Sequence, residues 1–277
     1  MSKVVWLASY PKSGNTWIRT FLWALQNKGP INLNRLYTGG IFSAKNIIET
    51  ILDVNPDTLY PHEIEEYQRI AYNYHFSNAK ETKFLKIHDA YTYSKWDGKP
   101  LIPLQPEHIV LYIVRNPIDV TPSFANHSSN DSETTINKQI NNSNGGLVKN
   151  ANWGNQFPQP MGNWSMHVES WLGQSVAPVH LVRYEDMKNH PFETFKEIVD
   201  KMGLIHTDDD IKIAIERTSF DKIKALELER GFREKANPDS SFFFHGKIGR
   251  GAEVLTPDQI SRIRKVHAKV MKQLKYW

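Results

Sequence analysis

The stretch that decides the fold is WLASYPKSGNTWIRTFL, residues 6–22, where an apolar run meets a small polar loop and then a helical pattern. The residues VVWLAS at 4–9 are typical of a buried parallel strand. After Gly14 the apolar residues recur at helical spacing. A strand, a glycine-containing loop and a helix in this order predict an anion site, because backbone N–H groups and the helix dipole converge there.

The loop YPKSGNTW (10–17) differs from the common triphosphate loop, G-x-x-x-x-G-K-[ST], which is absent from the chain. Lys12 precedes Gly14 by two residues, so it would approach an anion from the loop side. Ser13, Asn15 and Thr16 add side-chain donors to the charge of Lys12. An ordinary strand-to-helix turn with a solvated lysine is the alternative reading of these residues alone.

Three more apolar runs read as strands and alternate with helical segments. They are KFLKIH (83–88), HIVLYIVR (108–115) and PVHLVRYED (178–186). Strands that alternate with helices predict an α/β fold of three layers, in which helices flank a central parallel sheet. With no internal repeat and no linker, we expect a single domain over residues 1–277.

Composition limits the classes of function that the chain can serve. The 277 residues carry 34 basic and 30 acidic side chains, a balance too weak to predict nucleic-acid binding but suited to a small polyanion. Because cysteine is absent, disulfides, thiolate catalysis and cysteine zinc sites are excluded. The N-terminal apolar run is too short for membrane insertion, so we expect a soluble, cytoplasmic protein.

Two features predict irregular structure in the middle of the chain. The segment 128–162 is rich in Ser, Asn, Gly and Gln and reads as a long polar loop, a candidate mobile lid. Pro122 lies within NPIDVTPSFANH (116–127) and predicts an early turn or kink of that helix near Ser123.

Four motifs in order along the chain carry a family resemblance: YPKSGNTW (10–17), YIVRNPIDVTPSF (112–124), RYEDMKNHP (183–191) and RTSF (217–220). Together they resemble the cytosolic-type sulfotransferases, including compact bacterial forms, and Asn15 is the one departure from that family's loop. The resemblance implies a P-loop-NTPase-like fold and 3′-phosphoadenosine 5′-phosphosulfate (PAPS) as donor. It also implies transfer of a sulfuryl group to an acceptor hydroxyl or amine, with adenosine 3′,5′-bisphosphate (PAP) as product.

The resemblance also implies catalytic roles. His88 ends a predicted strand at the sheet edge where ligands bind, and it would take the acceptor's proton as general base. Lys12 would stabilise the departing phosphate, and Lys86 alternates with His88 on the same strand face. A hydrogen-bonded structural histidine remains the alternative for His88.

The resemblance implies the residues that contact the donor as well. The loop would hold the 5′-phosphosulfate, Trp17 would pack on adenine, and Arg115 with Ser123 would bind the 3′-phosphate. An ion pair with Asp119 is the alternative role of Arg115. The full set of expected donor contacts is Lys12, Ser13, Gly14, Asn15, Thr16, Trp17, Arg115, Ser123, Tyr184, Thr218, Phe220, His245, Gly246 and Lys247. We expect the Asn15 amide to donate to the sulfate or phosphate in place of the usual threonine.

The C-terminal motif departs most from the family pattern. FFFHGKIGRGAEVLT (242–256) has Phe244 and His245 where the family carries Arg-Lys, while two glycines are kept. Lys247 and Arg250 would supply the charge from shifted positions. A glycine-rich basic loop suits a phosphate, and a flexible surface loop is the alternative.

Two other functions remain open at this point. A small-molecule P-loop kinase would need magnesium ligands and a lysine after the glycine, and a nucleotide-binding module would bind without catalysis. We expect no metal, no nucleic acid and a small-molecule or glycoconjugate acceptor. Its pocket would be walled by the segments 37–76 and 128–162.

Overall fold

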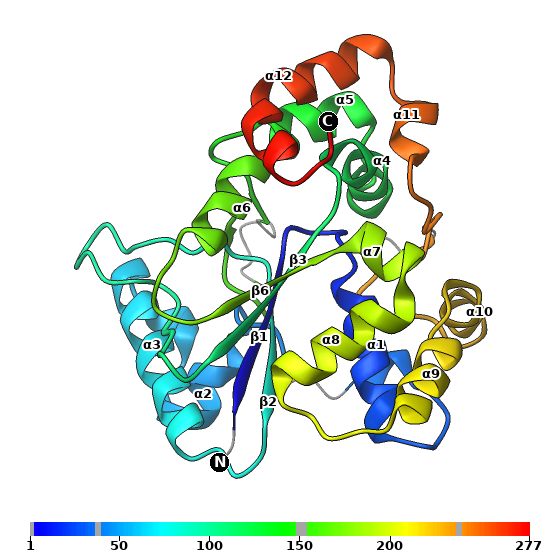
Figure 1. Cartoon of the computed structure of the whole chain (residues 1–277). Coiled ribbons are helices and arrows are strands. Elements are labelled where there is room, and N and C mark those ends of the chain that lie inside the picture. Colours follow the sequence, from blue (N-terminus) through cyan, green and yellow to red (C-terminus); the bar gives the residue numbers. More distant parts are fainter. Residues whose placement is uncertain (1–2, 37–39, 148–153, 237–239) are drawn as a thin grey trace.

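The computed structural model describes residues 3–36, 40–147, 154–236 and 240–277 of the chain. A parallel four-stranded sheet of order β2-β1-β3-β6 forms its centre (Figure 1). The strands are β1 (Val4–Ser9), β2 (Lys83–Ile87), β3 (Ile109–Val114) and β6 (Val179–Arg183). All four were predicted from apolar runs, and the parallel α/β architecture is confirmed.

The register of the sheet aligns the carboxyl ends of its strands. Ala8 of β1 pairs with Ile87, and Ser9 pairs with Ile113 of β3. The loop after β1, His88 after β2 and Arg115 after β3 therefore emerge at one edge. In open parallel sheets this edge is the place where ligands bind.

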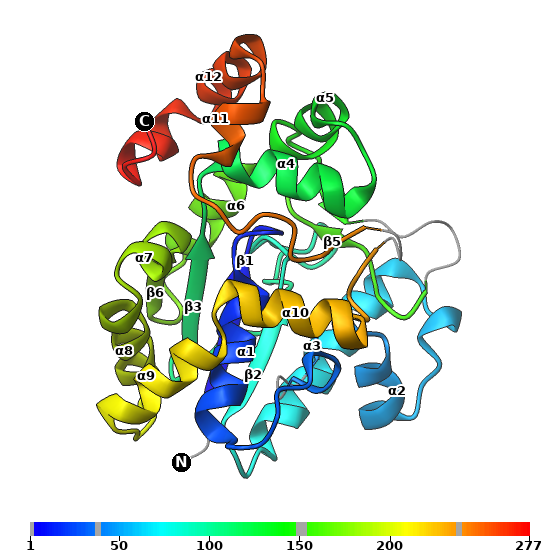
Figure 2. The same ribbon diagram turned by 90° about the vertical axis from the view of Figure 1, so that its right-hand side faces the viewer.

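Helices cover both faces of the sheet, which gives three layers (Figures 1 and 2). Successive strand residues point to opposite faces, so Leu7 joins one core and Trp6 the other. The Leu7 face packs against α1 (Asn15–Gln26), α8 (Pro191–Met202) and α9 (Asp208–Arg217). The Trp6 face packs against α3 (Pro61–Ser77), α4 (Pro117–Ser128), α6 (Trp164–Leu172) and α12 (Pro257–Gln273).

The remaining helical elements outside the segment 128–162 lie between these helices and strands. They are η1 (Leu33–Arg35), α2 (Asn46–Leu52), η2 (Pro56–Thr58), α7 (Tyr184–Asn189), α10 (Phe220–Arg230) and α11 (Arg250–Val254). The sequence did not predict α10, which crosses in front of α1 and β1 in Figure 2. No helix among the described residues has the length and apolar character needed to cross a membrane.

The segment 128–162 is not the structureless loop that its composition predicts. It contains α5 (Ser132–Thr135), η3 (Ile136–Ile140), and β4 (Gly146–Leu147) paired with β5 (Gln159–Pro160). Ile136 and Ile140 are fully buried and anchor the helical part of the segment. Their neighbours in sequence are mostly polar, so the composition of the segment does not reveal these two buried positions. Residues 148–153 lie outside the described part of the chain.

Helix α4 continues through Pro122, so the turn predicted near Ser123 does not end it. Proline has no N–H for the carbonyl of Ile118 four residues earlier. Gly251 of α11 packs against that carbonyl, since a Cβ at Gly251 would lie 2.0 Å from the Ile118 oxygen. The Asp119 carboxylate accepts hydrogen bonds from the N–H groups of Gly249 (2.8 Å) and Gly251 (2.7 Å) and fixes α11 there.

This close contact predicts an unusual effect for Gly251→Ala. Alanine normally stabilises a helix relative to glycine, but here its methyl group would meet backbone atoms. We expect the free energy of unfolding to fall by ~1–3 kcal/mol in denaturant titrations. Gly29→Ala is the matched control, because nothing lies within 4 Å of its Cβ position, and a change within ~0.5 kcal/mol is expected. Equal behaviour of the two variants would contradict the packing described above.

Candidate active site

The loop between β1 and α1 has the backbone of an anion-binding turn. Lys12 (φ 67°) and Gly14 (φ 110°) are both left-handed, a conformation that favours glycine. A Cβ at Gly14 would also lie 2.9 Å from Cδ2 of Tyr184. Gly14 is therefore required by its backbone and by the ring that packs on it, and α1 begins at the next residue, Asn15.

The polar side chains of the loop divide into two kinds. Asn15 donates through Nδ2 to the Leu7 carbonyl (2.8 Å) and to Ser9 Oγ (3.2 Å), so its amide is committed to the strand end. The expected contact of this amide with a bound anion would require one of these two hydrogen bonds to break. Ser13 is fully buried and its hydroxyl has no hydrogen-bond partner, while Thr16 is buried in the first turn of α1.

Lys12 lies against Phe242 from the C-terminal part of the chain. Its Nζ is 3.6 Å from the centroid of the Phe242 ring and 3.4 Å from the Phe242 carbonyl oxygen. Burial, together with the nearby charges of Lys86 and Arg115, lowers the pKa of Lys12 to about 7. An anion bound in the loop would reverse this effect, because an opposite charge favours the protonated lysine.

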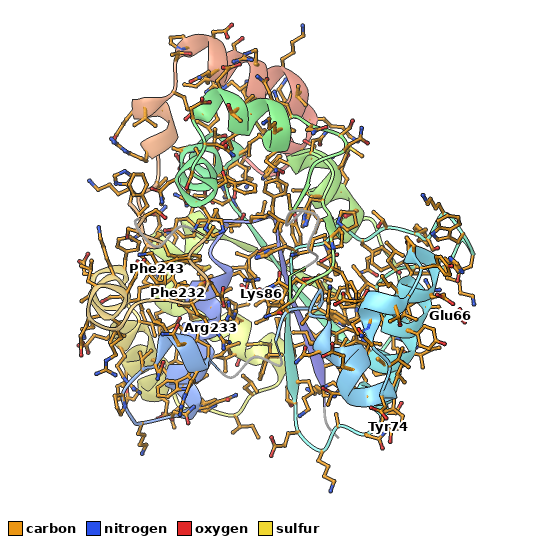
Figure 3. The ribbon with its side chains drawn as sticks, turned by 180° about the vertical axis from the view of Figure 1, so that it is seen from behind. Glu66, Tyr74, Lys86, Phe232, Arg233 and Phe243 are labelled. Carbon is orange, nitrogen blue, oxygen red and sulfur yellow. The ribbon has the colours of Figure 1, made fainter. Side chains whose placement is uncertain are left out.

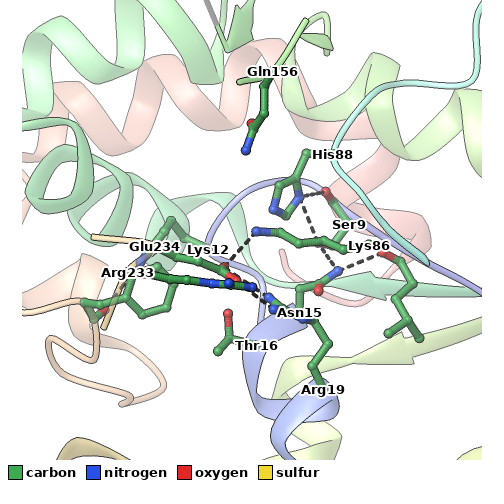
Figure 4. Close-up of polar contacts among 12 residues, drawn as sticks. Ser9, Lys12, Asn15, Thr16, Arg19, Lys86, His88, Gln156, Arg233 and Glu234 are labelled. Atoms are coloured by element: carbon green, nitrogen blue, oxygen red, sulfur yellow. Dashed lines mark hydrogen bonds and ion pairs between the residues drawn. The ribbon is translucent and has the colours of Figure 1, made fainter. Parts of the chain in front are cut away.

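His88 is buried at the end of β2, with 8% of its surface exposed. Its Nδ1 donates to the Ser9 carbonyl at 2.7 Å (Figure 4). Since a carbonyl only accepts, the proton lies on Nδ1 and the Nε2 lone pair is left as acceptor. Burial and the charge of Lys86 hold the pKa of His88 well below its usual value, so the ring is neutral near pH 7, as a general base requires.

A second histidine supports the backbone of His88. His167 of α6 donates from Nε2 to the His88 carbonyl (3.0 Å), and Tyr112 donates from its hydroxyl to His167 Nδ1 (2.8 Å). His167 and Tyr112 are both fully buried. These two hydrogen bonds give the His88 carbonyl a partner at the end of β2, where the sheet no longer provides one.

Lys86 points to the same side as His88, as strand alternation predicts (Figure 4). Its Nζ lies 2.9 Å from the Glu234 carboxylate, which also accepts a paired contact from Arg19. The sequence reasoning missed Arg19 and Glu234. An arginine four residues after Asn15, on the buried face of an apolar helix, was a signal for Arg19; Glu234 stands in no recognisable pattern.

Arg115 connects the loop with the C-terminal segment. Its guanidinium donates to the carbonyls of Lys247 (2.8 Å) and Lys12 (3.4 Å) and stacks on Tyr184, with Cζ 4.3 Å from the ring centroid. Its Nε is buried and has no partner. The Asp119 carboxylate instead holds the glycine N–H groups of α11.

Ser123 occupies the face of α4 that lies along the C-terminal segment. Asp119, four residues earlier, contacts Gly249 and Gly251. Asn126 donates to the Ser241 carbonyl at 2.8 Å, and the ring of His127 lies 5.6 Å from that of Phe242. Residues at this helical spacing share one face, so the structure brings Ser123 and Arg115 to the same segment.

Aromatic rings gather beside the loop at Trp17 and Phe220. The rings of Trp17 and Tyr184 lie 6.0 Å apart, and Lys188 Nζ is 5.8 Å from both Trp17 and Phe220. The Trp17 indole N–H is buried without a partner. Thr218, by contrast, is fully buried at the end of α9, and its hydroxyl donates to the Ala214 carbonyl.

The segment 241–249 crosses over the loop and contributes mainly its backbone. The Gly246 carbonyl accepts from the Tyr184 hydroxyl (3.0 Å), and a Cβ at Gly246 would meet Phe220 at 2.2 Å. The Lys247 side chain is exposed, whereas the half-buried His245 ring lies 3.9 Å from the neighbouring ring of Phe244. Lys247 thus meets Arg115 through its carbonyl.

Glu227 of α10 anchors this crossing segment. Its buried carboxylate accepts from the N–H groups of Phe242 (2.6 Å) and Phe243 (2.9 Å). The contact fixes the ring and carbonyl that Lys12 touches. Among the described residues, no group of three or more His, Asp or Glu is arranged to hold a metal ion.

These features define a P-loop-like α/β enzyme with a basic loop, a neutral histidine and an arginine at adjacent strand ends. The chain belongs to the sulfotransferase domain family, whose pattern it matches over residues 2–275. It is 26% identical over 269 residues to sulfotransferase 2A6 of Rattus norvegicus, covering 96% of this chain and 83% of that protein. Cytosolic sulfotransferase 1 of Arabidopsis thaliana is 25% identical over 270 residues, covering 93% and 75%.

Solved structures share the fold at lower identity. Mouse sulfotransferase SULT7A1 complexed with PAP superposes with a TM-score of 0.57, at 18% identity, over 98% of this chain and 84% of that one. Retinol dehydratase in complex with androsterone and the inactive cofactor PAP gives a TM-score of 0.61, at 18% identity, over 97% and 80%. The predicted sulfotransferase fold is confirmed.

Proposed function

We propose that this enzyme transfers the sulfuryl group of PAPS directly, in line, to an acceptor hydroxyl or amine. One observation carries the proposal: His88 is held neutral, with its Nε2 lone pair available, on the side of the sheet edge that Lys86 and the Lys12 loop share (Figure 4). This arrangement supplies a base for the acceptor and a cation for the leaving group.

The residues present fit the donor. Two buried donors near the loop, Ser13 Oγ and Arg115 Nε, have no partner within the described chain, and buried polar groups normally have one. A ligand with phosphates at both ends of an adenosine would satisfy both. We assign the 5′-phosphosulfate to Lys12, Ser13 and the N–H groups of the loop, and the 3′-phosphate to Arg115, Ser123 and Lys247.

Adenine would lie at Trp17 and Phe220, whose rings lie near Tyr184 and Gly246. The indole N–H of Trp17 is a further unpaired donor there. Asn15 and Thr218 contribute to this proposal only through the backbone that they stabilise, since their side chains bond within the protein. PAPS supplies the activated sulfuryl group.

The protein's own steps are proton transfer and charge stabilisation. His88 Nε2 accepts the acceptor's proton while Nδ1–H keeps its bond to the Ser9 carbonyl, which stabilises the resulting imidazolium. Lys12 and the N–H groups at the start of α1 stabilise charge on the departing phosphate. Holding both substrates between adjacent strand ends removes much of the entropic cost of their meeting.

The acceptor is proposed to be a small molecule or glycoconjugate that enters beside His88. The Gln156 side chain points toward His88 in Figure 4, and the buried Gln159 Oε1 has no partner. These two residues of the 128–162 segment support the placement of the acceptor. In the 37–76 stretch, Phe42, Tyr72 and Phe76 pack in the core around Trp6. We propose that the enzyme is cytoplasmic, as the name of the related cytosolic sulfotransferase 1 suggests, and that it forms a single domain.

Thermal unfolding with added nucleotides tests the proposal. We expect PAP to raise the unfolding midpoint strongly, because ligands that bind the native state stabilise it, and ATP with magnesium to raise it less. Labelled PAPS should then transfer sulfate in an acceptor screen. Stabilisation by ATP with magnesium alone would favour a kinase, and binding of PAP without transfer to any acceptor would favour a non-catalytic nucleotide module.

The state of His88 predicts the pH dependence of the reaction. The pKa of His88 lies well below 6.5, so the ring stays neutral as the pH falls to 6.5. We therefore expect kcat/KM to decline only below pH 6.5. His88→Ala should lower kcat by ~10²–10⁴-fold with PAP affinity retained, whereas the exposed His62→Ala should match wild type. On acidification, a loss of kcat/KM that begins above pH 7 would be inconsistent with this assignment.

A further inference from the structure

A buried ion cluster of Arg19, Lys86 and Glu234 lies beside the proposed reaction centre. Glu234 bonds both cations and joins three separate parts of the chain. We propose that Glu234, itself fixed by Arg19, is a positioning residue that holds the Lys86 ammonium in place and protonated for sulfuryl transfer. This inference rests on the proposed function and adds to it a residue outside the motifs that carry the family resemblance.

Arg19 fixes the Glu234 carboxylate independently of Lys86. The two N–H groups of the Arg19 fork donate to the two oxygens of Glu234 at 2.6 and 3.0 Å. Arg19 is only 4% exposed, and paired arginine–carboxylate contacts constrain direction as well as distance. The position of the Glu234 carboxylate is therefore fixed by the protein itself.

The backbone that carries Glu234 is held by aromatic packing. The neighbouring Phe232 is buried, and its ring centroid lies 4.7 Å from Phe242 and 5.8 Å from Phe243. Figure 3 shows Phe232 and Phe243 together, on the α10 side of Lys86. Glu227 anchors Phe242 and Phe243 in turn, so the position of Glu234 is coupled to the segment that covers Lys12.

Lys86 needs such a partner because of the charges around it. Lys12 on the loop, Arg19 on α1 and His88 just after β2 all lie near it, and Lys86 lowers the pKa of both Lys12 and His88. A lysine side chain also has many rotamers to lose. The 2.9 Å contact with Glu234 selects one of them and balances the local positive charge.

Glu234 is an anion rather than a competing base. Burial alone would raise the pKa of its carboxyl, but Lys86 and Arg19 outweigh burial and hold the pKa well below the usual range. The carboxylate therefore stays charged at any pH where the enzyme works. In an alternative role, the Glu234 carboxylate would act as a latch, occupying the donor site and moving away before the donor binds. The two hydrogen bonds from Arg19 disfavour such movement.

Chemical labelling of Lys86 tests this inference without relying on activity. Amine-reactive reagents modify the neutral lysine, and loss of an anionic neighbour favours that form. In Glu234→Gln we expect mass spectrometry to find Lys86 labelled ~5-fold or more faster at pH 8, because a change of less than one pKa unit suffices. Glu229→Gln, an exposed glutamate of α10 paired with Arg230, is the matched control and should leave the rate unchanged.

Kinetics supply the second measurement. We expect Glu234→Gln to lower kcat by ~10–100-fold while PAP affinity stays within ~3-fold, and to move the alkaline limb of kcat to lower pH. Glu234→Asp, which keeps the charge with a shorter reach, should restore the position of that limb but not the full rate. Thermal unfolding of each variant would show whether the fold is retained.

The outcomes separate the two proposals. If wild type neither binds PAP nor transfers sulfate, the proposed function fails, and the assignment of Lys86 to sulfuryl transfer fails with it. If wild type transfers sulfate but Glu234→Gln leaves the labelling rate and the alkaline limb unmoved, the positioning role alone is overturned. Tighter donor binding in Glu234→Gln would instead identify the carboxylate as a latch.

Discussion

The proposed site depends on a concentration of positive charge and unpaired donors around one loop. Lys12 is half-buried against Phe242, with its pKa lowered to about 7, and Ser13 is buried without a partner for its hydroxyl. Such groups cost stability when left alone. We therefore propose that the left-handed turn at Lys12 and Gly14 and the start of α1 serve a bound ligand as well as the fold.

The rest of the site holds these groups in fixed positions relative to one another. Parallel pairing brings the ends of β1, β2 and β3 to one edge, so the loop, His88 and Arg115 are neighbours although they are far apart in sequence. Two buried carboxylates then fix the covering segment through its backbone, Glu227 at Phe242 and Asp119 at α11. Backbone anchoring explains how this segment can lack the family's Arg-Lys pair and still lie over the loop.

Local pattern predicted the sheet and the loop because each strand is rich in apolar residues, although Lys86 interrupts β2 and His180 interrupts β6, and because Gly14 marks the turn. It failed where tertiary contacts decide. Ile136 and Ile140 order a polar segment by burial, and the amide of Asn15 turns inward to the Leu7 carbonyl. Arg19 and Glu234 meet across more than two hundred residues of sequence, and no spacing rule predicts such a pair.

Proton uptake on PAP binding tests the central claim most directly. With a pKa of about 7 in the free protein, Lys12 is mostly neutral at pH 8, and a bound phosphate would raise that pKa and protonate it. Calorimetry in buffers of different ionisation enthalpy should therefore find ~0.9 proton taken up at pH 8, and none in Lys12→Met. Binding without proton uptake by the wild-type protein would contradict the account.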